Sequence, residues 1–111
     1  MRRSLPLALG LIAALALLVA PASIAKGNKH VTIKGTYGYY NFSPKTVTIK
    51  KGKSVIWSWH SDEKHNVTFP KRHSATKRKV DAYKLTFSKV GTFHYTCTVH
   101  GFGGKVVVVA P

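Results

Sequence analysis

Three side chains in the second half of the chain could together bind a metal ion. Cys97 is the only cysteine among the 111 residues, His100 follows it by three positions, and His65 lies earlier in the chain. A thiolate with two imidazoles suits copper in a trigonal site, and the same donor set would accept zinc. A Cys-x-x-His pair is a weak signal by itself. The hypothesis therefore depends on whether the folded chain brings His65 to this pair.

Strand periodicity predicts which of these side chains point into the protein. Successive side chains of a strand lie on opposite faces of the sheet, so Cys97 should point inward with the apolar Phe93 and Tyr95. His65 has the same parity as Val67 and should also point inward. Burial as a small apolar residue is the usual alternative for a lone cysteine, since free cysteines are among the most buried residue types.

The elements that must position these residues are β-strands. Apolar and polar residues alternate through most of the chain after residue 26, and no stretch there keeps a helical period. Turn signals such as Lys51-Gly52-Lys53 separate the alternating runs. The sequence therefore predicts an all-β sandwich of about seven to eight strands. The runs that we assign are Val31–Lys34, Thr46–Lys50, Ser54–Trp59, Asn66–Phe69, Tyr83–Phe87, Thr92–Cys97 and Lys105–Val109.

The N-terminal segment has the pattern of a secretory signal peptide. Arg2 and Arg3 precede an apolar run, and small residues end the segment at Ala25. We expect residues 1–25 to be a signal peptide and residues 26–111 to form one small domain, since 86 residues are too few for two. A retained membrane anchor is the alternative. Either way, the domain is expected to be exported, to the periplasm or the cell exterior.

Composition limits how this domain is stabilised and what it attracts. One cysteine cannot form an internal disulfide, and a free thiol in an oxidising compartment needs protection by burial or by a metal. Removing Arg2 and Arg3 lowers the formal net charge from +15 to +13, which favours anionic partners or surfaces. Residues 70–79, PKRHSATKRK, are a basic loop, either a solvated surface or a region of association with anionic surfaces.

Taken together, several motifs resemble the cupredoxins, or type 1 blue copper proteins, and within them the plastocyanin and amicyanin group. The resemblance covers about residues 39–109. It includes FSPKTVTIKKGKSVIWSW, HNVTF, GTFHYTCTVH and GKVVV, which match the family's Phe-x-Pro strand, its first histidine, its Cys-x-x-His and its last strand. The resemblance implies a Greek-key β-sandwich.

The resemblance also implies a ligand set. His65, Cys97 and His100 would bind one copper ion, and Asn66 would tie the two ligand segments together by hydrogen bonds around the thiolate. His100 would be the point where electrons enter and leave. Phe102 would belong to the apolar rim that a redox partner touches.

One position departs from the family pattern. The family usually has a weak axial methionine three residues after the second histidine, and here that residue is Gly103. The loop is about one residue shorter, and the chain after residue 25 contains neither Met nor Gln. The axial position would be vacant, or filled by water or a backbone carbonyl such as that of Lys64. A third outcome is a site too weak to hold copper.

Several functions remain open at this point. We expect a monomeric electron carrier that cycles Cu(II)/Cu(I) and meets an acidic redox partner. The alternatives are a copper-binding protein for storage, delivery or sensing, and a basic module that binds polyanions without specific nucleic-acid recognition. We do not expect an enzyme, because no carboxylate belongs to the motif, and Asp62 and Glu63 have no assigned role as a base.

Overall fold

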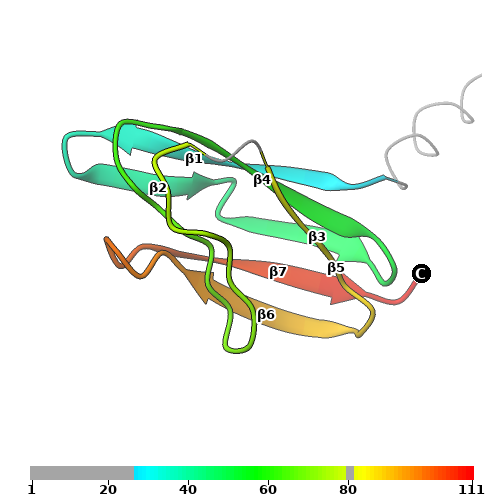
Figure 1. Ribbon diagram of the computed structural model, residues 1–111. Helices are drawn as coiled ribbons and strands as arrows, with labels where there is room; N and C mark the ends of the chain where they lie inside the picture. Colours follow the sequence, from blue (N-terminus) through cyan, green and yellow to red (C-terminus); the bar gives the residue numbers. More distant parts are fainter. Residues whose placement is uncertain (1–26, 80–81) are drawn as a thin grey trace, which may run out of the picture.

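Seven β-strands form where apolar and polar residues alternate, in a computed structural model that describes residues 27–79 and 82–111 (Figure 1). Four strands form one sheet in the order β2-β1-β4-β5, and three form a second sheet in the order β3-β7-β6. This confirms the expected all-β sandwich. The strands are β1 (Lys29–Thr36), β2 (Tyr39–Ser43), β3 (Thr46–Lys50), β4 (Ser54–Ser61), β5 (Tyr83–Thr86), β6 (Gly91–Thr96) and β7 (Gly103–Val109).

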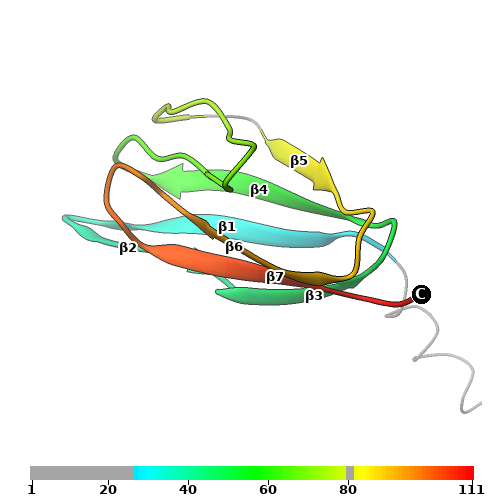
Figure 2. The same ribbon diagram turned by 90° about the horizontal axis from the view of Figure 1, so that it is seen from below.

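The strand pairing mixes parallel and antiparallel neighbours. β1 runs parallel to β4, and β3 runs parallel to β7, whereas the β1/β2, β4/β5 and β6/β7 pairs are antiparallel. The chain therefore changes sheets after β2, after β3 and after β5. Figures 1 and 2 show that the turn between β1 and β2 lies at the same end of the sandwich as the turn between β6 and β7.

The core lies between the two sheets and follows the period-two pattern. On β4, Val55, Trp57 and Trp59 are buried, and on β7 the alternate residues Val106 and Val108 are buried. Burying these large apolar side chains is the main favourable contribution to folding in a domain without a disulfide. Because the strands are held in register by this core, the residues at their ends occupy fixed positions.

Two expectations about the strands were wrong. Asn66–Phe69 was expected to be a strand, but only Thr68 pairs as an isolated bridge, with Thr96 of β6 and with His73. This segment belongs to the long connection between β4 and β5, which crosses to the edge of the other sheet (Figure 1). Conversely, β2 was not expected, because its tyrosines and Asn41 do not alternate cleanly.

The expected signal peptide, residues 1–25, lies outside the described residues. Within the part of the chain that is described, no helix is long and apolar enough to cross a membrane.

Candidate metal centre

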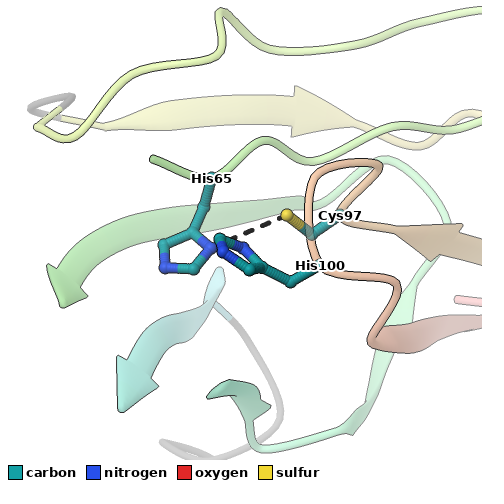
Figure 3. Close-up of side chains that lie close together, drawn as sticks. All are labelled: His65, Cys97 and His100. Carbon is teal, nitrogen blue, oxygen red and sulfur yellow. Dashed lines mark hydrogen bonds between the residues drawn. The ribbon is translucent and has the colours of Figure 1, made fainter. Parts of the chain in front are cut away.

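His65, Cys97 and His100 lie together at one end of the sandwich (Figure 3). One ligand atom from each residue lies within 4.8 Å of the others. The Sγ atom of Cys97 is 3.6 Å from Nδ1 of His65. The side chains of His65 and Cys97 are fully buried, whereas His100 is exposed. The tertiary structure therefore brings together the three residues that the sequence singled out.

The spacing of these atoms fits a bound metal ion. Metal–sulfur and metal–nitrogen distances of about 2.3 and 2.0 Å, at an angle of 120°, would place the two ligand atoms about 3.7 Å apart. The observed separation of 3.6 Å between Cys97 Sγ and His65 Nδ1 matches this value. A thiolate and two imidazoles are the donors that suit copper or zinc. Cys97 and His65 therefore fit such an ion as they are placed, and the ligand atom of His100 lies within 4.8 Å of theirs.

The end of β4 fixes the orientation of His65. Its Nε2 lies 2.6 Å from Oγ of Ser61, the last residue of that strand. The indole N–H of Trp59 donates a hydrogen bond of 3.2 Å to the backbone carbonyl of His65. With the proton on Nε2 donated to Ser61, Nδ1 is left with a free lone pair toward Cys97. Such hydrogen bonds commonly set the tautomer and ring orientation of a metal-binding histidine.

Burial also favours the form of His65 that can bind a metal. Burial lowers the pKa of His65, and a positive charge on His100 acts in the same direction. The carboxylates of Glu63 and Asp62 oppose this shift. A metal binds the neutral imidazole, so a lowered pKa reduces proton competition for the ligand nitrogen.

Asn66 links the segment of His65 to the segment of Cys97. Its side-chain amide donates hydrogen bonds to Thr98 Oγ1 at 2.8 Å and to Thr76 Oγ1 at 2.9 Å. Its carbonyl oxygen accepts bonds from the Thr98 backbone N–H at 3.0 Å and from the Thr68 hydroxyl at 2.8 Å. Because Thr98 directly follows Cys97, the buried amide holds the two ligand segments at a fixed separation.

A short turn positions His100 relative to Cys97. The N–H of Gly101 donates to the carbonyl of Cys97 at 2.8 Å, and the N–H of Cys97 donates to the carbonyl of Phe102 at 2.9 Å. Gly101 has a φ of 83°, in the left-handed region that glycine adopts readily. These contacts close the loop between β6 and β7 and place His100 at its exposed tip.

Two aromatic rings pack against the ligand histidines. The ring centroid of Tyr40 lies 4.7 Å from that of His65 and 4.6 Å from that of His100. The ring of Phe102 lies 5.4 Å from His65 in an edge-on arrangement and 4.6 Å from Phe42 in the core. The candidate site is therefore lined by aromatic surface on more than one side.

This fold and donor set can be compared with known proteins. The chain matches the model of the cupredoxin-like domain over residues 8–108. The chain belongs to the cupredoxin-like family. It is 33% identical over 116 aligned positions to amicyanin-alpha of Methylorubrum extorquens, a match that covers 91% of this chain and 98% of the relative.

Two further matches to this cupredoxin are amicyanins. It is 39% identical over 70 positions to the amicyanin of Paracoccus versutus, covering 56% of this chain but only 53%, about half, of that relative. A solved structure of the Cu(I) form of an amicyanin variant superimposes with a TM-score of 0.63 at 32% identity, covering 78% of this chain and 87% of the other. The resemblance inferred from the motifs is thus confirmed at the level of the family.

Within this cupredoxin, the side chain that lies against the ligand histidines just before β7 is that of Phe102. Gly104, Val106 and Val108 are buried, so Phe102 shares the parity of the core-facing residues. A Cβ on Gly103 would instead meet the backbone oxygen of Tyr95 at 3.1 Å. The ring of Phe102 is partly buried and packs against the core and against His65.

Two contacts of the site had no signal in the sequence. Ser61 ends a strand four residues before His65, and nothing in its type or spacing indicated a bond to a histidine ring. Tyr40 belongs to none of the motifs that indicate a ligand, and the pairing of β1 with β2 places it against His65 and His100.

Proposed function

We propose that this cupredoxin is an exported, small type 1 copper protein that carries electrons. The observation that carries this proposal is the cluster of two imidazoles and one thiol, whose ligand atoms lie within 4.8 Å of one another. One relative of known structure, an amicyanin variant, is described in a Cu(I) form. His65, Cys97 and His100 would hold one copper ion, which supplies reversible one-electron transfer between Cu(II) and Cu(I).

The residues around the cluster suit a site that changes little during such a cycle. His65 is held by Ser61 and by burial, and Cys97 is held by backbone bonds and by the Asn66 link. Fixed ligands avoid the cost of reorganisation when an electron moves, as in other preorganised sites. His100 is the exposed ligand and so the shortest route for an electron to reach the surface.

We further propose that the axial coordination is atypical because Phe102 takes the place of a donor. Its ring lies 5.4 Å from His65 and presents carbon and hydrogen only. A ring without a lone pair adds no ligand and excludes water from the space it fills. Because the axial ligand tunes the reduction potential, an axial side without a donor should favour Cu(I) and raise the potential.

The proposed cellular setting is the periplasm or the cell exterior, reached through cleavage after Ala25. Cleavage there removes Arg2 and Arg3 and leaves a formal net charge of +13, which would steer a monomeric carrier toward an acidic redox partner and raise the encounter rate more than the affinity. Mass spectrometry of exported protein should find Lys26 as the first residue. A chain that keeps residues 1–25 in the membrane would instead support the anchor alternative.

An electron carrier fits this site better than an enzyme. The metal-binding cluster contains no carboxylate that could act as a general base. The hydrogen bond from Ser61 orients the ring of His65, and the bond from Asn66 to Thr98 holds the segment of Cys97. Both bonds therefore position metal ligands and not a substrate.

The decisive experiment is copper loading of the protein followed by visible and electron paramagnetic resonance spectroscopy. A copper–thiolate bond gives an intense visible band, and Cys97→Ser should abolish this band. A matched control is His94→Gln, which changes an exposed histidine on β6 that points away from the core and should keep the full band. A colourless copper adduct of the unmutated protein would contradict the proposal.

The second candidate is a copper-binding protein that does not transfer electrons. The Phe102 ring would favour this candidate, because an axial side without a donor stabilises Cu(I). A storage or delivery protein would bind Cu(I) tightly and release it without reversible cycling. Cyclic voltammetry separates the two candidates, since a carrier gives a reversible one-electron wave. Slow or irreversible oxidation would favour storage, delivery or sensing.

Association with anionic surfaces through residues 70–79 is a separate proposal. Lys71, Arg72, Lys77 and Lys79 are exposed in this segment. Binding to a polyanion such as heparin should weaken steeply with salt and should not change on copper removal or in Cys97→Ser. Binding that is insensitive to salt would contradict it.

A further inference from the structure

The outer edge of β6 is paired at one end and open along the rest of the strand. Thr68 and Thr96 exchange two backbone hydrogen bonds, of 2.9 and 3.0 Å, so the connection between β4 and β5 begins to extend the second sheet at this edge. An antiparallel neighbour would next place Pro70 opposite His94. Proline has no N–H to donate, and it commonly ends pairing at the edge of a sheet. Among the described residues, β6 has no further partner on this side.

The open part of the edge offers backbone groups for pairing. The N–H and C=O groups of one residue point to the same side of a strand, and this side alternates from residue to residue. Those of Thr92 and His94 therefore face the same edge as those of Thr96. In the part of the chain that the structure describes, no other backbone group bonds to them. Unpaired edge groups of this kind are a template for an extended peptide.

A groove of about 550 Å³ runs along this edge, and its floor is apolar. The ring centroid of Phe87 lies 5.9 Å from that of Phe69 and 5.5 Å from that of Phe93. Leu85 of β5 also lines the groove. Phe93 and Leu85 are only partly buried, so part of each remains accessible to an apolar side chain of a ligand. The volume lies within the range of about 300–1,000 Å³ that is usual for ligand sites.

The rim of the groove is basic. Lys71 and Arg72 follow Phe69 on one side, Lys89 lies between β5 and β6, and His94 lies on β6 itself; all four side chains are exposed. No carboxylate occurs among the described residues that line the groove. An acidic ligand is therefore favoured by charge. A second copy of this strongly basic chain would instead bring like charges together.

Hydrogen bonds hold the basic wall of the groove in place. The N–H of Phe69 donates to the carbonyl of Arg72 at 2.8 Å, and the N–H of Ser74 donates to the carbonyl of Val67 at 2.9 Å. The buried hydroxyl of Ser74 accepts a further bond of 2.9 Å from the N–H of Val67. The wall is therefore ordered before a ligand arrives, which lowers the entropic cost of binding.

We propose that the open edge of β6 binds an extended acidic segment of another protein, which is added to the second sheet as a further strand. Alternate side chains of such a strand point to opposite faces, so apolar side chains would meet the phenylalanines and carboxylates would meet the basic rim. Thr92 is five residues before Cys97, roughly 16 Å along a strand, so the contact is separate from the metal ligands. The inference does not depend on electron transfer. It also goes beyond the association of residues 70–79 with polyanions, because it requires a peptide backbone.

The test uses a short acidic probe, the peptide acetyl-EVEVE-amide, with the protein both copper-free and loaded with Cu(I). Binding is measured by NMR from the shifts of backbone amides. The control probe is methylated at its three central backbone nitrogens, so it keeps every charge but cannot donate hydrogen bonds there. It should bind at least tenfold more weakly than the unmethylated probe, and copper should change neither affinity. The unmethylated probe should slow hydrogen exchange at the amides of Thr92 and His94. Affinities of the two probes within twofold of each other would overturn the inference in favour of attraction by charge alone.

A matched pair of proline variants tests the edge itself. Thr92→Pro removes one N–H from the open edge and should weaken binding of the unmethylated probe at least tenfold. Thr48→Pro is the control, because Thr48 is an exposed threonine of β3, the other edge strand of the same sheet, and its N–H also points away from β7. Thr48→Pro should stay within twofold of the parent. Binding by Thr92→Pro within twofold of the parent would overturn the inference.

A second pair of variants leaves the backbone intact and decides the matter if Thr92→Pro does not fold. Arg72→Glu reverses a charge at the rim and should weaken binding of the unmethylated probe at least fivefold at 0.15 M salt. Lys50→Glu, at the exposed end of β3, should stay within twofold, because it lies on the opposite edge of the sheet. Equal affinities of these two variants would contradict a role for the rim. A dimer of the parent in analytical ultracentrifugation that Arg72→Glu alters and Lys50→Glu does not would replace the acidic partner by a second copy and overturn the inference.

Discussion

The two ligand histidines lie in contrasting surroundings, although their side chains are only a few ångströms apart. His65 is fully buried and is held by hydrogen bonds to its ring and its backbone, from Ser61 and Trp59. His100 is exposed on a turn, and its ring is positioned by contacts with Tyr40 and Phe102. One ligand is therefore fixed by the core, and the other is positioned at the surface by aromatic packing.

This difference matches what an electron-transfer site requires. A buried ligand fixed by directional bonds preserves the geometry of the site. An exposed ligand gives electrons a short path to a partner. The Asn66 amide joins the two halves, because it bonds to Thr98 in the loop that contains His100. The following predictions test how far the buried half and the exposed half are independent.

The largest effect is expected from deleting each imidazole in turn. His100→Gly should lose the visible band and regain most of it on addition of free imidazole, because the vacated position is open to solvent. His65→Gly should lose the band and not regain it at the same imidazole concentration, because that position is fully buried. Titration of both copper-loaded variants with imidazole checks this. If imidazole restored the band equally in both variants, the two histidine positions would not differ in their access to solvent.

Adding a donor beside the site should change the reduction potential. Phe102→Met places a thioether where the ring now faces His65, so it should stabilise Cu(II) and lower the potential by about 60 mV or more, a tenfold change in relative affinity. Phe102→Leu, which adds no donor, is the control and should keep the potential nearly unchanged. Protein-film voltammetry measures both.

Position 103 provides a further comparison for the same question. A side chain on Gly103 would point to the backbone of Tyr95, so Gly103→Met should leave the copper spectrum unchanged and cost folding stability through the close contact. A lowered potential in Gly103→Met, with none in Phe102→Met, would show that the axial position belongs to Gly103.

Breaking the link between the two halves should reduce stability by a moderate amount. Asn66→Ala removes four hydrogen bonds of a buried amide and should lower the free energy of unfolding by about 2 kcal/mol or more. Thr76→Val removes one of these bonds and should cost about 1 kcal/mol or less. Urea denaturation of the copper-free proteins gives both values, and similar losses for the two variants would contradict a linking role for Asn66.

The smallest effect concerns the pH dependence of the copper-free protein. Because burial lowers the pKa of His65 in the folded state, the unfolded chain binds more protons between that pKa and about 6.5. The free energy of unfolding should therefore rise with pH through this range, and the contribution should be lost as pH falls through the folded-state pKa. Urea titrations at several pH values should show a flatter profile for His65→Gln. An identical profile would show that His65 is not responsible.

The sequence predicted the fold class because the pattern that defines it is local. Alternation along β1, β3, β4, β6 and β7 follows from the geometry of a strand with one buried face. The same parity correctly placed His65 and Cys97 in the interior. By contrast, β2 was not predicted, and residues 66–69 were wrongly predicted to be a strand. The structure of both segments depends on the neighbouring strand with which they pair. Alternation in Asn66–Phe69 indicated a strand, but the segment crosses between sheets and only Thr68 is paired.

The amino-acid sequence by itself determined the donor types, their inward parity and the family, because these depend on residue identity and on periodicity within single strands. Only the tertiary structure decided that Ser61 orients His65, that Tyr40 covers both histidines and that Phe102 rather than Gly103 faces the ligands. The physical reason is that each of these contacts joins elements whose relative position is set by sheet pairing and core packing. Residue type and local spacing contain no information about those distances.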